Sequence, residues 1–394
     1  MLLAVQDNDP GCQRHLAQPL PWHAEHVLDD MTALIDHRLD PLELHPDNLD
    51  YGVISQKIWS SGLTLQIWCA SCGDFHAQSD LVADWEWDST PCTMWSSSGR
   101  EKHLADPANF VWICTTRRHH LTATPAIMYE NVTKQPAWFV AKDHPSRLMF
   151  RLERAPRHVG FKFTNRLRAL TFMPHTDKVQ VRRDPAALFD AVSALLQARD
   201  LTRPGMLFEQ SEIEFLVEAQ MLCQRRFEQE LPCHIIAQVL QEGLNAVDFT
   251  FLLNAREVCS LNDFVERYRN MTGMDAFQNP DLVVFVGDNG STHLSWSAVP
   301  NALPTTRMNT GLLWAPYWRR WVSSRKLLTS LGIPQTQRHL ASLGFMSPSE
   351  VANFQFENLL PRARKKWAGN CVHAALAGVF LACMLSSVRL NHRN

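Results

Sequence analysis

Residues 80–99, DLVADWEWDSTPCTMWSSSG, join a strand-like run to a turn that carries a cysteine. The run 80–88 precedes Pro91-Cys92, and serine and glycine follow the cysteine. Open α/β sheets bind ligands outside the carboxyl ends of their strands, so the Cys92 thiol is expected at a ligand-binding edge. A lone Pro-Cys is equally compatible with a buried small side chain, because free cysteine packs as an apolar residue.

Two apolar runs near the start of the chain predict further strands. They are Leu2-Leu3-Ala4-Val5 and Ala24-Glu25-His26-Val27-Leu28, with a helix-like stretch around 11–16 between them. Strand, helix and strand in this order are typical of a parallel sheet, so the chain is predicted to be an α/β protein.

Periodicity predicts the remaining elements. One helix is expected to start near 106 and to include 110–114, and others at 185–201, 211–230, 319–331 and 370–388. Strands are expected at 126–129 and within 147–173. Residues 275–316 are rich in strand and loop signals.

Composition excludes a disordered chain, a collagen-like repeat and a small disulfide scaffold. The chain has 394 residues, 45% of them hydrophobic and 20% charged, which suits two or three globular domains. Residues 1–90 hold 15 acidic and 3 basic side chains, whereas residues 91–394 hold 25 and 35. The basic excess favours a polyanion such as nucleic acid, with an ordinary solvated surface as the alternative.

The ten cysteines and the apolar runs suggest an intracellular protein. Residues 1–5 are too short for a secretory signal, so reduced thiols are expected. The run 371–385 is shorter than the ~20 residues that a membrane span needs, so we interpret it as a buried helix.

A carboxylate is expected at the same sheet edge as the thiol. Glu130-Asn131-Val132 ends the predicted strand 126–129. A thiol nucleophile beside a proton donor makes a plausible covalent acid–base site. Taken alone, Glu130 could also be a solvated strand end.

Together these residues resemble the cytosine-5 DNA methyltransferase family. Its nucleophile loop reads Pro-Cys-x-x-Phe-Ser-x-x-Gly, with Trp95 here in place of Phe, and its Glu-Asn-Val follows the cysteine by 38 residues here. Three more blocks follow in the family's order: Thr164-Asn165-Arg166-Leu167-Arg168, the stretch 321–334, and Gly369-Asn370-Cys371-Val372. The resemblance covers most of residues 1–175 and 319–390.

The resemblance implies a doubly wound, Rossmann-like methyltransferase domain with a smaller inserted target-recognition domain. It divides the chain into a catalytic segment 1–176 with an insertion at 33–79, a recognition segment 177–318, and a return segment 319–394 that ends in a helix. The implied activity is that of a DNA (cytosine-5-)-methyltransferase. It transfers a methyl group from S-adenosylmethionine to C5 of a cytosine flipped out of double-stranded DNA. A monomer is expected, located in the nucleus if the organism is eukaryotic.

The resemblance also assigns roles to residues. Cys92 would form the covalent adduct at C6 of the base, and a protonated Glu130 would hydrogen-bond N3. Arg168 and Arg166 would hold the base oxygen O2 and the Glu130 carboxylate. Ser96 and Ser98 would clamp the backbone phosphate.

The implied cofactor contacts lie at both ends of the chain. Asp7 would bind the ribose hydroxyls of S-adenosylmethionine, Asn8 would lie beside the adenine, and Asp30 would meet the adenine amine. Asn370 and Val372 of the last block would complete this set. The family's Phe-x-Gly-x-Gly loop should lie about 20 residues before Asp7, where this sequence has only six, so weak cofactor binding is expected.

Two alternative functions remain. One is a non-catalytic nucleic-acid-binding relative without the cofactor site. The other is an RNA cytosine-5 methyltransferase, which is less favoured because the Cys-Phe-Thr tripeptide typical of the transfer-RNA enzymes is absent from this sequence.

Two further groups of residues have open interpretations. Basic residues could contact phosphates or could lie on a solvated face: Arg182, Arg183, Arg225, Arg226, Arg256, Arg362, Arg364, Lys365 and Lys366. Cys69, Cys72 and His76 have zinc-like spacing, but no second cysteine pair follows at a suitable distance. An ordinary insertion is therefore preferred there, and no metal site is assigned.

Overall fold

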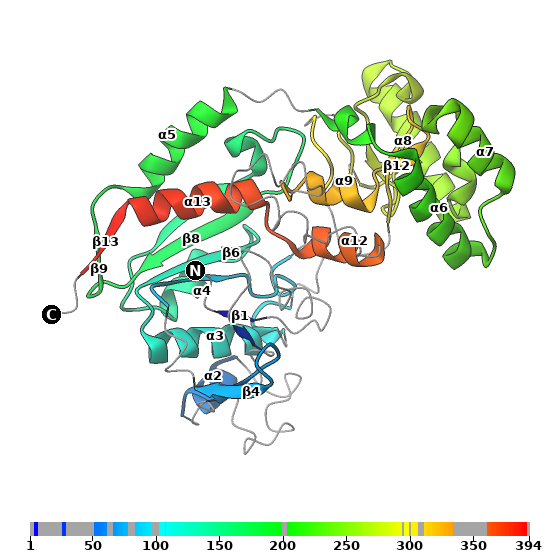
Figure 1. The fold of residues 1–394 in the computed structure, drawn as a ribbon. Helices are drawn as coiled ribbons and strands as arrows, with labels where there is room; N and C mark the ends of the chain where they lie inside the picture. Colours follow the sequence, from blue (N-terminus) through cyan, green and yellow to red (C-terminus); the bar gives the residue numbers. More distant parts are fainter. Residues whose placement is uncertain are drawn as a thin grey trace, which may run out of the picture. The chain divides into compact units, whose positions relative to one another are not determined.

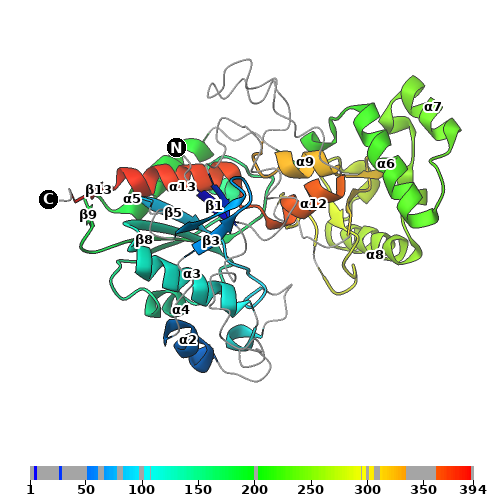
Figure 2. The same cartoon turned by 60° about the horizontal axis from the view of Figure 1, so that its bottom comes forward.

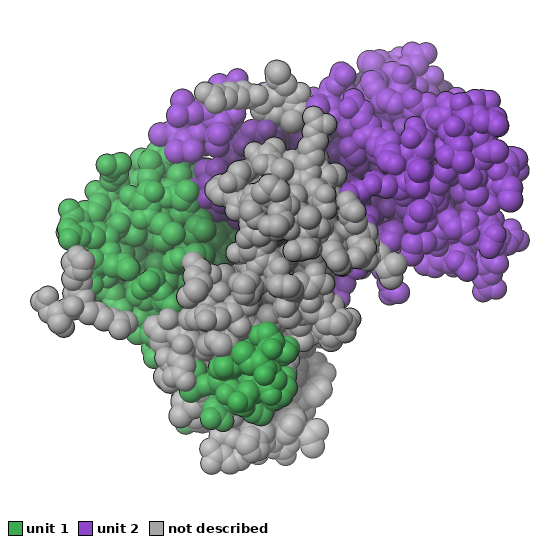
Figure 3. Space-filling view, in the orientation of Figure 1, with its two compact units in different colours: residues 1–154, 167–190, 380–394 green, residues 155–166, 191–379 purple. Residues whose placement is uncertain are grey.

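A computed structural model gives the fold, drawn in Figure 1 and from another side in Figure 2. It describes residues 4–6, 26–28, 51–60, 66–77, 83–96, 102–106, 108–198, 203–293, 295–298, 301–305, 311–333 and 361–391. Their packing separates two compact units, coloured in Figure 3: residues 1–154, 167–190 and 380–394, and residues 155–166 and 191–379. The functional division at 176 and 318 stays a prediction.

The first unit is built on a mixed four-stranded sheet. Its order is β5-β6-β8-β7, with bounds Trp85–Asp88, Ala126–Asn131, Arg168–Pro174 and Phe150–Arg154. Strands β5 and β6 are parallel, and helix α3 (Asn109–Thr122) connects them. Strand β8 runs antiparallel to β6 and to β7. This β–α–β arrangement confirms the predicted α/β class.

Aromatic side chains cover both faces of this sheet. On one face, Trp112 of α3 and Phe139 of α4 (Ala137–Lys142) pack together, and Trp112 contacts Tyr129 of β6. On the other face, Phe380 meets Trp87 of β5 at 6.1 Å between ring centroids. Helices on both faces of a largely buried sheet form the layered α/β/α architecture that the sequence predicts.

A second sheet of this unit contains the two N-terminal strands. Strand β1 (Ala4–Gln6) pairs parallel with β2 (His26–Leu28), as the strand–helix–strand pattern predicts. Strands β3 (Gln66–Cys69) and β4 (Asp74–Ala77) complete it as an antiparallel hairpin. Helix α2 (Tyr51–Ser60) and β3 contribute Ile54, Ile58 and Ile67 to the same core as Trp112, so part of the segment 33–79 belongs to the core.

The last elements of the first unit form a two-stranded antiparallel pair. Strand β9 (Val179–Val181) pairs with β13 (Val388–Leu390). Helices α5 (Pro185–Gln197) and α13 (Ala374–Ser386) each begin in one unit and end in the other.

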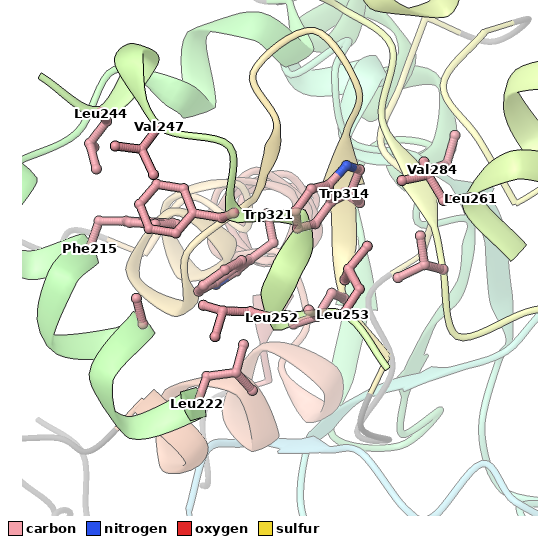
Figure 4. Packing of buried hydrophobic residues seen from close by; sticks show 14 of the residues in the cluster. Phe215, Leu222, Leu244, Val247, Leu252, Leu253, Leu261, Val284, Trp314 and Trp321 are labelled. Atoms are coloured by element: carbon pink, nitrogen blue, oxygen red, sulfur yellow. The ribbon is translucent and has the colours of Figure 1, made fainter. Parts of the chain in front are cut away.

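The second unit is mostly helical and surrounds a large aromatic core. Its helices are α6 (Glu212–Phe227), α7 (Cys233–Glu242), α8 (Ala255–Thr272), α9 (Ser324–Thr329) and α12 (Pro361–Asn370). A small antiparallel sheet joins β10 (Val284–Phe285), β11 (Leu313–Ala315) and β12 (Arg320–Trp321). Figure 4 shows the core around Phe215, Trp314 and Trp321.

Two predicted helices near the end of the chain are wrong in extent. Within 319–331, residues 320 and 321 form a strand, and α9 begins only where the Ser323 hydroxyl accepts from the backbone N–H of Lys326. Within 370–388, α12 ends at Asn370 and α13 starts after His373, whose Nδ1 accepts from the N–H of Leu376 at 3.3 Å. A side-chain acceptor at a helix start fixes that start, which hydrophobic periodicity alone does not specify.

Other elements differ from their predicted bounds by only a few residues. Strand β5 begins at Trp85, and residues 80–82 of the predicted run lie outside the described residues. Helices α5 and α6 end at Gln197 and Phe227, short of the predicted ends at 201 and 230. None of the described helices combines the length and the apolar character that crossing a bilayer requires.

Candidate active site

Cys92 opens a turn that directly follows β5. Its carbonyl accepts backbone hydrogen bonds from Trp95 at 3.0 Å and from Ser96 at 2.8 Å. Met94 and Trp95 are buried, and the Trp95 ring packs against Phe139 at 5.3 Å. The turn is thereby anchored in the core while the Cys92 thiol stays only half-buried.

Hydrogen bonds tie this turn to the end of the neighbouring strand β6. The Thr90 hydroxyl bonds the Tyr129 hydroxyl in the interior. Asn131 Nδ2 donates to the Thr90 carbonyl at 3.2 Å and to the Tyr129 hydroxyl at 2.7 Å. Because Tyr129 and Asn131 flank Glu130, these contacts hold the cysteine turn and the Glu130 segment at one edge of the sheet.

Glu130 pairs with an arginine on the adjacent strand. In the β6–β8 register Glu130 lies opposite Leu170, so Arg168 is its diagonal neighbour on the same face. Arg168 Nε lies 2.8 Å from Glu130 Oε1, and the Ser89 hydroxyl donates to Oε2 at 3.1 Å. Glu130 is 7% exposed, so the ion pair is largely shielded from water.

Of the other predicted site residues, Ser96 belongs to the cysteine turn, and the rest are in the second unit or outside the described residues. Arg166 belongs to the second unit, where Nη2 donates to the Gly369 carbonyl at 3.0 Å. Val372 is half-buried in that unit, and Asn370 is the last residue of α12. Ser96 is half-buried in the first unit. Four predicted residues lie outside the described residues: Asp7, Asn8, Asp30 and Ser98.

The N-terminal strands suit the predicted cofactor contacts. The parallel register places Gln6 of β1 level with Leu28 of β2, so both strands end at one edge. Asp7 follows the first strand directly and Asp30 follows the second by two residues. Carboxylates accept hydrogen bonds, so two of them that follow adjacent parallel strands fit the ribose hydroxyls and the adenine amine of S-adenosylmethionine, which donate.

Two of the predicted phosphate-binding residues make contacts inside the second unit instead. Arg226 makes a bidentate pair with Glu257, with Nη–Oε distances of 2.5 and 2.8 Å. Lys365 is partly buried, and its ammonium group donates to the Gly311 carbonyl at 2.5 Å. Burial lowers the pKa of Lys365 to about 8. The phosphate-binding hypothesis is therefore weakened for Arg226 and Lys365.

Sequence reasoning missed a buried ionic cluster beneath the first sheet. Glu86 and Asp88 of β5 face α3, where His119 Nε2 lies 3.2 and 2.7 Å from their carboxylate oxygens. Arg118 pairs with Glu86 as well. Although burial opposes ionisation, Arg118 and His119 lower the pKa of Glu86 to about 2. Burial also lowers the pKa of His119, but Asp88 and Glu86 raise it more. The alternation of tryptophan and carboxylate in residues 85–88 was the available signal.

The chain is similar in structure to several known methyltransferases. The S. pombe Dnmt2 methyltransferase is 9% identical with a TM-score of 0.45, covering 98% of this chain and 90% of that one. The Entamoeba histolytica methyltransferase EhMeth is 10% identical with a TM-score of 0.41, covering 98% of both chains. A protein described as a DNA modification methyltransferase encoded within an E. coli prophage is 12% identical with a TM-score of 0.48, covering 98% and 92%.

No protein-family model and no curated protein matches the sequence. The fold and the site define an α/β protein with a thiol, a carboxylate and a guanidinium group on adjoining segments of one sheet. The function proposed below therefore depends on the contacts within this chain.

Proposed function

We propose that the protein is an S-adenosylmethionine-dependent methyltransferase that methylates C5 of cytosine in double-stranded DNA. The observation that carries this proposal is the placement of Cys92, Glu130 and Arg168. The cysteine turn is bonded to the end of β6, and Glu130 of that strand is paired with Arg168 of β8 at 2.8 Å. A nucleophile, a proton donor and a positioning cation are the groups that addition to a pyrimidine ring requires.

Cys92 supplies the nucleophile. C5 of cytosine is a poor nucleophile, but a thiolate that adds to C6 pushes the electrons of the C5–C6 double bond onto C5. C5 then forms the new carbon–carbon bond to the methyl group. Loss of the C5 proton expels the Cys92 thiolate and restores both the ring and the enzyme. S-Adenosylmethionine, when bound, would supply this methyl group from its sulfonium sulfur and leave as the neutral thioether S-adenosylhomocysteine, and the C5 proton would pass to solvent water.

Glu130 offsets the negative charge that the addition places on the ring. In its protonated form it donates a hydrogen bond to N3 of the base. Arg168 Nε and the Ser89 hydroxyl already contact the two oxygens of this carboxyl group. Its orientation is therefore set before the base arrives, and preorganised polar groups stabilise developing charge most effectively.

The covalent step gives a direct test. Because weak cofactor binding is expected, the full chain is incubated with a large excess of S-adenosylmethionine and with duplex DNA containing 5-fluorocytosine, in which fluorine at C5 blocks elimination of the cysteine. We expect a denaturation-resistant protein–DNA adduct with the wild type and none with Cys92→Ser. Cys233→Ser, which changes an exposed thiol of the second unit, is the matched control and should still form the adduct.

Each other result rejects a defined part of the proposal. An adduct with Cys92→Ser would exclude this thiol as the nucleophile. An adduct with the matching 5-fluorocytosine RNA only would replace DNA by RNA as the substrate. Duplex binding in a gel-shift assay without adduct on either nucleic acid would identify a non-catalytic binding protein.

A further inference from the structure

The hairpin formed by β3 and β4 closes with a tight cysteine-bearing turn. Its connection is Ala70-Ser71-Cys72-Gly73, and the Gly73 N–H donates to the Cys69 carbonyl at 2.9 Å. Gly73 has φ +67°, in the left-handed region that glycine adopts without strain. The turn thus folds the chain back so that Cys69 and Cys72 lie on one side of it.

The strand register brings a histidine to the two cysteines. Cys69 pairs with Asp74 and Ile67 pairs with His76, so His76 is a diagonal neighbour of Cys69 on the same face. The two sulfur atoms and a ring nitrogen of His76 all lie within 4.8 Å of one another. Three residues whose spacing in sequence provides no second cysteine pair therefore form a cluster of three ligand atoms in space.

The size of the cluster suits a tetrahedral zinc ion. Zinc binds thiolate at 2.3 Å and imidazole at about 2.0–2.1 Å, so ligand atoms in such a site lie about 3.5–3.8 Å apart. Ligand atoms already within 4.8 Å need to close by only about 1 Å, a movement that side-chain rotation provides. Cys69 is buried, His76 half-buried and Cys72 exposed, which leaves a path for the ion from solvent.

We propose that Cys69, Cys72 and His76 bind Zn²⁺. Two thiolates balance the charge of the ion, and this mixture of sulfur and nitrogen ligands favours zinc over magnesium or calcium. Binding releases the thiol protons to solvent, and the fourth position is taken by water or by another side chain. The Ser71 hydroxyl lies 3.1 Å from the Cys69 sulfur and supports that ligand from outside the coordination shell.

A second group of metal-ligand residues in the described part of the chain does not compete for this role. Glu86, Asp88 and His119 also have ligand atoms within 4.8 Å of one another. There, however, Arg118 is already paired with Glu86 and supplies the positive charge. The hairpin cluster is different because two of its three ligands are thiols, which a divalent ion deprotonates on binding.

Zinc would add support at the β4 side of the second sheet. Strand β3 pairs with β2 and contributes Ile67 to the core, whereas among the described strands β4 pairs with β3 alone. The opposite face of the hairpin exposes the ring pair Trp68 and Phe75, which are 39% and 57% accessible. Leu28 of β2 pairs with Cys69, so a bound ion would also fix the end of β2. Asp30 follows that strand by two residues.

The test compares the zinc content of the full chain with that of two ligand variants. Protein is incubated with zinc chloride under reducing conditions, separated from free metal by gel filtration, and analysed by mass spectrometry for zinc. Cys72→Ser and His76→Gln should each hold one zinc equivalent fewer than the wild type, with affinity lowered at least about tenfold. Cys259→Ser, an exposed thiol on α8, is the matched control and should keep the wild-type content.

Cobalt substitution provides an independent readout. Co²⁺ bound to the wild type should show the intense visible bands of a tetrahedral ion and a thiolate charge-transfer band, both weakened in Cys72→Ser. Wild-type zinc content in both ligand variants would overturn the proposal, and so would an equal loss in Cys259→Ser. If the wild type binds no zinc under reducing conditions and forms a Cys69–Cys72 disulfide once the reductant is removed in air, with oxygen as the oxidant, the two thiols are a redox pair and the zinc proposal is overturned. Circular dichroism confirms that the variants are folded, and Cys72 is exposed, so its hydroxyl replacement disturbs no packing.

Discussion

Replacing Arg118 by methionine should destabilise the protein in a pH-dependent way. Glu86 is 9% exposed and its carboxylate is paired with the Arg118 guanidinium. The pKa of Glu86 falls from 4.5 to about 2 in the folded protein, with burial opposing the shift and Arg118 as the largest favourable cause. At about 1.4 kcal/mol per pKa unit, this shift corresponds to about 3 kcal/mol of stability at neutral pH, which Arg118, His119 and Thr124 produce together. Arg118 is the largest of these causes, so Arg118→Met is expected to lose a large part of it.

The sign of the pH dependence follows from the lowered pKa. The contribution of Glu86 is fully present above its unfolded pKa near 4.5 and is lost as pH falls toward 2. The decrease in the free energy of unfolding caused by Arg118→Met should therefore be largest at pH 7 and should shrink below pH 4.5. His119 has the opposite pH dependence because its pKa is raised in the folded protein. Its contribution to stability is fully present below its pKa in the unfolded chain and is lost as pH rises through its pKa in the folded protein.

Urea unfolding at pH 7 and at pH 3.5 measures both effects. Circular dichroism and tryptophan fluorescence are followed together, because coincident transitions are the test of two-state behaviour. Arg154→Met is the matched control: its partner Asp190 is 58% exposed, so the loss should stay below about 1 kcal/mol. A loss in Arg118→Met no larger than in the control, or one independent of pH, would refute the assignment.

Three further substitutions have defined outcomes. Arg168→Leu should cost about 3–5 kcal/mol in urea unfolding because it leaves Glu130 buried without its cation, and adding Glu130→Gln should recover much of that loss. Gly311→Ala should lower the melting temperature, at a cost of about 1–3 kcal/mol, because the new Cβ would stand 2.3 Å from an aromatic ring atom; Gly378→Ala, with open space around it, should not. Lys365→Met should raise the free energy of unfolding at pH 7 by about 2 kcal/mol, because burial disfavours the charged lysine and lowers its pKa to about 8, which outweighs the lost hydrogen bond to Gly311. The gain should vanish as pH rises from 8 to 10.5, where the lysine is neutral in the folded protein.

The strands of the first unit and the residues that follow them were predictable, because both depend on the pattern of apolar residues over a short stretch of sequence. Alternating and continuous apolar runs predicted β1, β2, β5 and β6, and the residues after β5 and β6 identified Cys92 and Glu130. The parallel pairing of β5 with β6 was expected from the helix between them. By contrast, α7 and α8 went unrecognised, although both have an apolar stripe that packs into the core of the second unit.

The sequence by itself determined the α/β class and the residue types of the candidate site, because strand period and turn composition are encoded within a few neighbouring residues. Only the tertiary structure decided which partners meet. Glu130 and Arg168 are 38 residues apart, and the β6–β8 register makes them diagonal neighbours. The same applies to Arg118, whose partner Glu86 lies on another element. Likewise, the hairpin register turns Cys69, Cys72 and His76 into one cluster. Register and packing depend on burial summed over whole strands and helices, so no local pattern specifies such pairs.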